Sequence, residues 1–223
     1  MKTFTTKAAA RKKPARKGGR PSAEQAERLG EQILAVASES FLAQGYGATS
    51  IEAIAQAAGI AKRTFYARYK DKEALFAAVV HRLVTNLRPE HDAQLFTGKS
   101  REAILLNLAK IILQAALKPE ALALHRIMVG EAMRFPELAK VLDTQGARLE
   151  AVQRIGQLLQ HTAPDQKFLR KDAEFAAEQF LELVVAVPQR RAIGLGTAMT
   201  AAEAERWGKQ AVALFLNGCD GLK

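Results

Sequence analysis

Apolar side chains in the first part of the chain recur every three or four residues, which is the spacing of a helix with one buried face. Ile33, Ala37 and Phe41 form such a face, and Gln and Glu residues occupy much of the opposite side. This pattern predicts a helix over 23–44. Gly45 follows it, and a glycine there can take the left-handed conformation that closes a helix.

Two short helices are expected next. Thr49 and Glu52 have the Ser/Thr-x-x-Glu spacing of a capping box and predict a second helix that ends at Gly59. A third helix is expected from Lys62 to about Tyr69. A short helix that ends in glycine and is followed at once by another is typical of a helix-turn-helix.

Longer helices are expected in the rest of the chain. Asp71 caps a fourth helix over 72–87, and Pro89 with the polar stretch to Ser100 indicates a change of domain. Further helices are expected over 101–117, 120–134, 136–161, 168–187 and 203–217, and the segment PQRRAIGLGTAMT is expected to be a loop. No stretch of useful length alternates as a strand does. The predicted fold class is therefore all-α, with about nine helices.

Composition agrees with helices and with a protein of the cytoplasm. Hydrophobic residues make up 48% of the 223 residues, and the dominant Ala, Leu, Glu, Gln, Lys and Arg lose little rotamer freedom in a helix. Cys219 is the single cysteine, so no intrachain disulfide is expected. The apolar runs are too short to span a bilayer, and no hydrophobic stretch follows the basic N-terminus as in a secretory signal. We therefore expect a cytoplasmic protein without a membrane span.

The chain lacks the motifs of common enzymes and metal sites. Gly-x-Ser-x-Gly and His-Glu-x-x-His do not occur, and GLGTA lacks the preceding strand and third glycine of a phosphate-binding loop. The four histidines share no metal-ligand spacing. The sequence therefore predicts neither catalysis nor a metal or other cofactor.

Positive charge is concentrated at the N-terminus. Residues 1–21 contain eight Lys and Arg and no acidic residue, and the whole chain has a formal charge of +10. Such an arm commonly binds polyanions, although a solubilising extension would have the same composition. Arg20 follows two glycines in KGGRP, which favours insertion into the narrow minor groove of DNA.

The segment KRTFYARYK, residues 62–70, places aromatic and basic side chains on opposite sides of a helix. Phe65 and Tyr69 lie four residues apart, so both are expected to face inward and anchor the helix. The side chains expected to project outward towards DNA are Arg63, Thr64, Tyr66 and Lys70. Such a face suits the major groove, whose width admits one helix. For each basic residue taken singly, the alternative to a DNA contact is an ordinary solvated charge on the surface.

Residues flanking this segment are candidates for contacts with DNA phosphates. Thr49 precedes the second helix, so its hydroxyl and the amides that follow can meet a phosphate. Lys72 opens the fourth helix and can reach the same backbone. The ring of Tyr66 can pack while its hydroxyl bonds a phosphate oxygen.

These motifs occur together in one known family. Residues 27–87 resemble the DNA-binding domain of the tetracycline-repressor (TetR/AcrR) family of bacterial transcription regulators, and the matching segment is ILAVASESFLAQGYGATSIEAIAQAAGIAKRTFYARYKDKEAL. The phosphate contacts that the resemblance implies are Thr49, Tyr66 and Lys72. It also implies that side chains around 62–66 probe base edges. The family commonly has a small residue after its turn, where this chain has the pair Lys62–Arg63.

The resemblance also implies the organisation of the chain. A basic arm over 1–22 would precede a three-helix helix-turn-helix domain over 23–88, with its motif at about 50–69, and a long fourth helix would join it to a helical effector-binding and dimerisation domain over 89–223. The segment HRIMVGEAMRFPELAKVLDTQG resembles the ligand-binding domain of the AefR-like subgroup. In the family this domain dimerises through its last two helices and often encloses an effector cavity.

Two apolar stripes in the last two expected helices fit such a dimer, and packing within one chain is the alternative. The candidate interface residues are Phe175, Phe180, Leu183, Val184, Val187, Trp207, Ala211 and Phe215. Met128, Met133 and Phe135 are candidates to line an apolar effector pocket, or else to fill a core.

The function predicted from the sequence is sequence-specific transcription regulation. We expect a ligand-responsive repressor that binds a palindromic operator in double-stranded DNA as a homodimer and responds to an apolar small molecule. The alternative is an architectural protein that binds DNA of any sequence through its basic arm. The affinity of such a protein would collapse steeply with salt, whereas a regulator keeps a preference of ~10³–10⁷-fold for its site.

Overall fold

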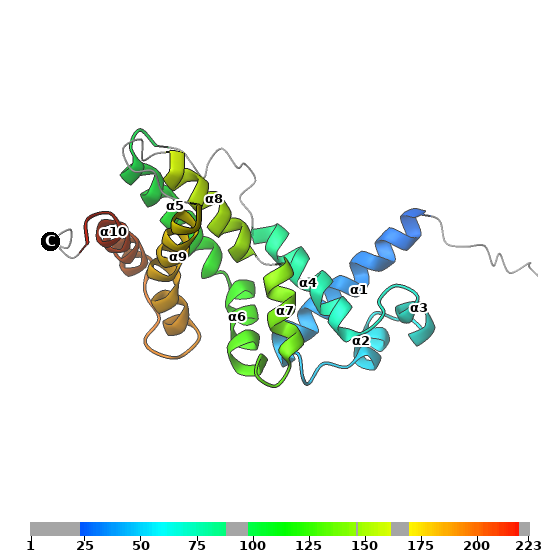
Figure 1. Cartoon of the computed structure of the whole chain (residues 1–223). Helices are drawn as coiled ribbons and strands as arrows, with labels where there is room; N and C mark the ends of the chain where they lie inside the picture. Colours follow the sequence, from blue (N-terminus) through cyan, green and yellow to red (C-terminus); the bar gives the residue numbers. More distant parts are fainter. Residues whose placement is uncertain (1–22, 88–97, 146, 162–169, 219–223) are drawn as a thin grey trace, which may run out of the picture.

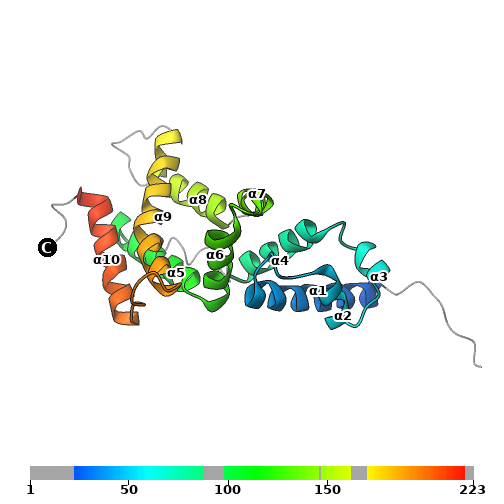
Figure 2. The same ribbon diagram turned by 90° about the horizontal axis from the view of Figure 1, so that it is seen from below.

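The computed structural model describes residues 23–87, 98–145, 147–161 and 170–218, and within these ranges the chain forms ten α-helices and no strand. The helices are α1 (Ala23–Gln44), α2 (Ile51–Ala57), α3 (Lys62–Tyr66), α4 (Lys72–Leu87), α5 (Arg101–Ala116), α6 (Pro119–Glu131), α7 (Pro136–Gln145), α8 (Ala147–His161), α9 (Arg170–Ala192) and α10 (Ala201–Asn217). α1–α4 lie at one end of an elongated molecule and α10 at the other (Figures 1 and 2). The all-α fold class is confirmed.

The first and fourth helices have the predicted bounds because their ends are marked in the local sequence. Gly45 follows α1 with a φ of +88°, and its amide donates to the carbonyl of Phe41 at 2.9 Å. Asp71 caps α4 by accepting a hydrogen bond from the amide of Ala74 at 2.8 Å.

The prediction of a capping box at Thr49 is wrong. The N-cap of α2 is Ser50, whose side chain accepts a hydrogen bond from the amide of Ala53 at 3.1 Å. Thr49 is only 2% exposed and donates its hydroxyl to the carbonyl of Gly45 at 2.7 Å. Serine and threonine cap helices almost equally well, so the burial of Thr49, which the sequence does not reveal, decides between them.

The segment 136–161 contains two helices where one was predicted, which accounts for ten helices instead of about nine. α7 ends at Gln145 and α8 begins at Ala147. The sequence has a glycine between them, at position 146. A glycine inside a helix costs roughly 0.5–1 kcal/mol relative to alanine, and an apolar periodicity that continues on both sides conceals that cost.

α9 continues through Pro188 to Ala192, so the prediction that a loop begins at the proline is wrong. Proline lacks the N–H that the carbonyl of Val184 would accept in the helix. Trp207 of α10 donates its indole N–H to that carbonyl at 3.1 Å and so takes the place of the missing donor. The chain leaves the helical conformation at Gly194, which has a φ of +102°.

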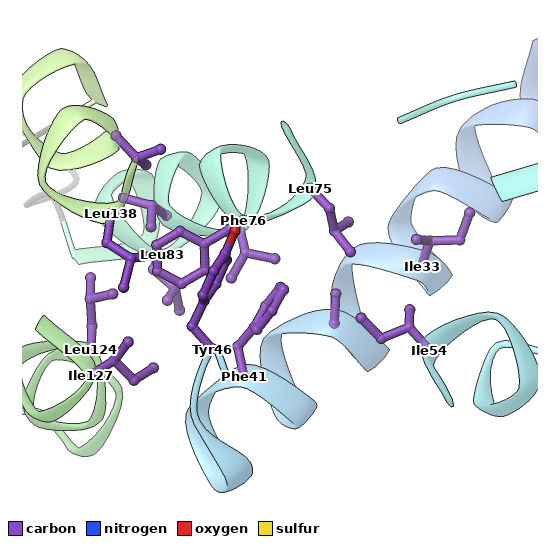
Figure 3. Packing of buried hydrophobic residues seen from close by; sticks show 14 of the residues in the cluster. Ile33, Phe41, Tyr46, Ile54, Leu75, Phe76, Leu83, Leu124, Ile127 and Leu138 are labelled. Carbon is purple, nitrogen blue, oxygen red and sulfur yellow. The ribbon is translucent and has the colours of Figure 1, made fainter. Parts of the chain in front are cut away.

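Buried apolar residues form two separate cores. The first joins α1–α4 with α6 and α7, and we call these six helices the head. Figure 3 shows Leu124 and Leu138, from α6 and α7, beside Tyr46 and Phe76 of this core. The second core joins α5, α8, α9 and α10, which we call the body. The head therefore includes helices that lie beyond residue 88, where the sequence indicated a change of domain.

Candidate nucleic-acid interface

The turn between α2 and α3 has the tight geometry of a helix-turn-helix. Gly59 has a φ of +65°, and the amide of Ile60 donates back to the carbonyl of Ala55 at 2.9 Å. A residue in the left-handed conformation with this hydrogen bond ends a helix within one turn. α3 can therefore start at Lys62 and lie at the outer end of the head, away from the body (Figure 2).

α3 is shorter than predicted but keeps the predicted anchor. It ends at Tyr66, so Tyr69 lies in the turn that follows it. Phe65 is fully buried, and its ring centroid lies 5.7 Å from that of Tyr69, which packs partly buried against the head core. Both rings face inward, as predicted.

The residues predicted to project outward from this segment are exposed. Arg63, Thr64 and Lys70 are exposed side chains. Tyr66 is 50% exposed, and its ring packs edge-on against Phe65 with centroids 5.5 Å apart. A guanidinium, two hydroxyls and an ammonium group are thus available at the surface around one buried ring, which is a set of donors suited to base edges and phosphates.

Lys62 is exposed, and it forms a salt bridge with a carboxylate of α2. Its Nζ lies 2.5 Å from Oε1 of Glu52 on α2. The hydrogen bond between them lowers the pKa of Glu52 and raises the pKa of Lys62, so both stay charged near neutral pH. Because both side chains are more than half exposed, the pair adds little stability. It does place a negative charge next to the first cation of α3.

The structure does not support the predicted phosphate contact of Thr49. Its hydroxyl proton is donated to the carbonyl of Gly45, and the residue is buried, so no proton is left for a phosphate oxygen. Ser50, the next residue, is exposed and caps α2. Ser50 is therefore the better placed hydroxyl on this side of the head.

Lys72 lies beside the turn between α1 and α2. Its Nζ is 4.3 Å from the ring centroid of Tyr46 and donates to the carbonyl of Gly47 at 3.4 Å. Partial burial lowers the pKa of Lys72, and the carboxylates of Glu131 and Glu137 oppose that effect. The lysine is therefore held at the turn by an aromatic face and a carbonyl, and does not extend freely from the surface.

Arg68 is a supporting residue that the sequence analysis missed. Its Nη1 donates to the carbonyl of Ala26 on α1 at 2.7 Å, and its guanidinium lies over Gly30, where a Cβ would overlap it. This contact fixes the end of the α3 segment to α1. A buried glycine inside α1 is the signal that something packs closely there, but it does not say what.

Glu131 and Glu137, from α6 and α7, were also missed. Glu131 accepts hydrogen bonds from the amides of Tyr46 and Gly47, and Glu137 accepts one from the hydroxyl of Tyr46 at 3.3 Å. A separation of 84 residues between Gly47 and Glu131 leaves no trace in a local sequence pattern.

The predicted dimer-interface residues divide into buried and partly exposed groups. Phe180, Val184 and Ala211 belong to the body core of the single chain, as the alternative of packing within one chain stated. Phe215, Leu183, Val187 and Trp207 are partly buried, and Phe215 packs edge-on against Phe180 with centroids 5.1 Å apart. Phe175 is 62% exposed on α9.

The three candidates for an effector pocket do not line one cavity. Met133 is fully exposed, whereas Met128 and Phe135 pack against the head core. An open groove of about 680 Å³ lies elsewhere on the head, between α1 and α4.

Arg20 lies outside the described residues. Among the described helices, none has the length and apolar character needed to cross a bilayer.

Two family models match the chain. A model of the C-terminal domain of AefR-like transcriptional repressors matches residues 103–218, and a model of bacterial regulatory proteins of the tetR family matches residues 33–79. The tetR-family match lies within α1–α4 and includes every described residue that was predicted to contact DNA, whereas the AefR-like match spans the body and also α6 and α7 of the head.

Individual relatives agree with these matches. The repressor ComR of Escherichia coli (strain K12) is 40% identical over 70 residues, which are 31% of this chain and only 33% of ComR. The regulator AcrR of Shigella flexneri is 29% identical over 146 residues, 64% of this chain and 67% of AcrR.

Solved structures extend the similarity to most of the chain. The flavonoid-responsive regulator FrrA has a TM-score of 0.69 and 31% identity, covering 85% of this chain and 96% of FrrA. A TetR-family regulator from Mesorhizobium loti also has a TM-score of 0.69, with 26% identity, and covers 86% of this chain and 96% of the other. All the relatives named here are transcription regulators.

Proposed function

This chain belongs to the TetR family of bacterial transcription regulators, and we propose that it is a repressor that binds a palindromic operator as a homodimer and leaves it when a small molecule binds. The observation that supports this most directly is α3, where buried Phe65 anchors a short helix whose Arg63 and Thr64 are exposed at the outer end of the head. The protein would act in the cytoplasm, where operator DNA is accessible to it.

In this proposal α3 lies in the major groove. Arg63 and Thr64 would contact base edges, because a guanidinium bonds guanine bidentately and a hydroxyl bonds any base. Lys62, the first residue of α3, would take part when DNA displaces Glu52 from it. Positions 23–88 would form the DNA-binding unit, with a basic arm over 1–22 whose Arg20 reaches the minor groove.

Phosphate contacts would surround the recognition helix. Tyr66 ends α3, Ser50 caps α2 and Lys72 opens α4, so each carries a donor next to the helix-turn-helix, and Lys70 adds a positive charge beyond α3. These contacts would set the register of α3 on the duplex without carrying sequence information. Ser50 replaces Thr49 in this role because the hydroxyl proton of Thr49 is already donated within the turn.

Dimerisation through α9 and α10 would place two heads on one duplex. Phe175 exposes most of its ring, and Leu183, Val187 and Trp207 leave part of their surfaces uncovered. Apolar surface on two adjacent helices at the end opposite the head is what a symmetric interface requires. The two recognition helices would then meet half-sites about 34–36 Å apart or a multiple of that distance.

The effector would be a small, largely apolar molecule. The flavonoid responsiveness of FrrA, which is 31% identical to this chain over most of its length, suggests planar polyphenols as the first compounds to test. A ligand that binds better to a dimer with respaced heads would lower operator affinity, since both half-sites could no longer be engaged together.

Footprinting of the full chain on the DNA upstream of its own coding region tests the proposal. A symmetric protected palindrome that is lost on addition of a flavonoid is the expected result. Arg63→Ala should weaken protection of this palindrome, whereas Arg126→Ala, which removes an exposed arginine of α6, should leave it unchanged. Protection without symmetry, spread along any DNA and lost steeply with salt, would instead favour an architectural protein that relies on the basic arm.

A further inference from the structure

The turn between α1 and α2 is held by a side chain from outside the helix-turn-helix. Glu131, the last residue of α6, accepts the amide of Tyr46 on Oε1 at 2.9 Å and the amide of Gly47 on Oε2 at 2.6 Å. Two successive amides that converge on one anion form a nest, a backbone concavity that binds negative charge. Hydrogen bonds to a charged acceptor are also stronger than those between neutral groups. One carboxylate therefore fixes two consecutive peptide units.

The glycines of GYG leave room for this carboxylate. Gly45 has a φ of +88°, and a Cβ there would overlap Oε1 of Glu131. A Cβ at Gly47 would lie 2.9 Å from Oε2 and 3.0 Å from the ring of Phe135, both closer than van der Waals contact allows. A side chain at either glycine would have to displace Glu131. The turn and the carboxylate are thus fitted to each other.

The same turn also contacts Lys72, the first residue of α4. The ring of Tyr46 lies against Phe41 and Phe76 (Figure 3) and against Phe135, at centroid distances between 5.1 and 5.7 Å, so these three rings fix its position. Lys72 sits over that ring and donates to the carbonyl of Gly47. Glu131 binds the amides of Tyr46 and Gly47, while Lys72 contacts the ring of Tyr46 and the carbonyl of Gly47. The carboxylate therefore constrains the backbone of the two residues that hold the lysine.

We propose that Glu131 is a positioning residue for operator binding, which holds the turn between α1 and α2 so that Lys72 and Ser50 meet the DNA phosphates. This inference rests on the proposed function. It assigns to α6, which lies in the region matched by the AefR-like C-terminal model, a part in DNA recognition. Ser50 follows the fixed peptide of Gly47 by only three residues, so a change in the turn displaces its hydroxyl as well.

Two variants and a matched control test the role of Glu131 in the full-length chain. Glu131→Gln keeps the shape but loses the charge and offers only one acceptor oxygen to the two amides. Glu131→Ala leaves both amides without the carboxylate. Glu120→Gln makes the same change of charge at an exposed position in the first turn of the same helix.

Hydrogen exchange of the free protein reports on the contact itself. Both Glu131 variants should exchange the amide protons of Tyr46 and Gly47 faster than the wild type does, while amides in the body keep their rates. Glu120→Gln should match the wild type throughout. Unchanged exchange at Tyr46 and Gly47 in both Glu131 variants would overturn the proposal before any DNA is added.

Operator binding as a function of salt separates positioning from mere stabilisation. The slope of log K against log[salt] should become shallower by about 0.9 for each phosphate contact that is lost. Glu131→Gln should therefore reduce the slope. Adding Lys72→Ala to this variant should not reduce the slope further, because the phosphate contact of Lys72 is already lost. A lower thermal midpoint with wild-type affinity and slope would show that Glu131 is only structural. If the wild type itself shows no preference for an operator, the proposed function fails, and the exchange data still decide whether Glu131 holds the turn.

Discussion

Trp207 donates its indole N–H to the carbonyl of Val184, the carbonyl that Pro188 leaves without a donor four residues later in α9. The same N–H also donates to the carbonyl of Leu183 at 3.0 Å, so it is shared between two successive carbonyls of α9. α10 thus supplies a hydrogen-bond donor to α9 near the proline at which the sequence suggests that α9 should end. The contact also uses a residue that the sequence placed in the dimer interface.

We predict that Trp207→Phe lowers the free energy of unfolding by about 1–3 kcal/mol, because the carbonyl of Val184 is left without a donor in the body core. Pro188→Ala restores the backbone N–H, so Trp207→Phe should cost clearly less in that background. Urea denaturation followed by circular dichroism measures both costs at one protein concentration, since Trp207 is the single tryptophan and fluorescence is lost with it. Equal costs in the two backgrounds would mean that the indole does not replace the missing N–H.

The sequence predicted helix ends that have local signals better than features that depend on distant contacts, for a physical reason. Gly45, Gly59 and Asp71 mark helix ends through their own backbone or side-chain chemistry, and each acts where it was expected. The interior of α9 depends instead on Trp207, and the state of Thr49 depends on its burial. Interactions between distant segments decide these cases, and no local pattern encodes them.

The same distinction applies to the candidate interface. Phe65 and the exposed side chains around it follow from helical spacing alone, so their positions could be predicted. Spacing could not show that Lys62 is paired with Glu52, or that a carboxylate of α6 holds the turn before α2. The shape of the recognition surface was therefore accessible from the sequence, while its charge balance required the structure.

We predict that Arg63→Ala and Thr64→Ala change which operator is preferred, because side chains that contact base edges carry ~1–3 kcal/mol of discrimination at each position. Tyr66→Phe should instead weaken binding by a similar factor on all sequences, since it removes only a hydroxyl that faces phosphate. Selection from a randomised site library gives the preference of each protein. Base preferences of both Arg63 and Thr64 variants that match the wild type would refute their assignment to base contacts.

We predict that Gly30→Ala and Arg68→Ala are strongly coupled. Alanine is favoured over glycine inside a helix by about 1 kcal/mol, but a Cβ at Gly30 overlaps the guanidinium of Arg68 and would break its bond to Ala26. Gly30→Ala should therefore give little or no gain in stability in the wild type and about 1 kcal/mol in an Arg68→Ala background. Chemical denaturation of the four proteins measures the difference. A full gain in the wild-type background would show that Arg68 moves aside at no cost.

We predict that Glu52→Gln raises the affinity for random DNA and lowers the ratio of specific to non-specific binding. The substitution removes the negative charge 2.5 Å from Lys62, so this lysine becomes available to any phosphate. The salt dependence of non-specific binding should then steepen by about 0.9 per protomer for the added contact.

Glu205→Gln is the matched control for this change. Glu205 on α10 pairs with Lys209 at 2.7 Å, both side chains are about as exposed as Glu52 and Lys62, and α10 lies at the end of the molecule opposite α3. Its loss alters the net charge equally, so a general increase in positive charge would steepen both slopes alike. Light scattering should show the same oligomeric state for both variants. A steeper slope for Glu52→Gln alone assigns the effect to Lys62 at the DNA surface, and equal slopes would remove Glu52 from any role in specificity.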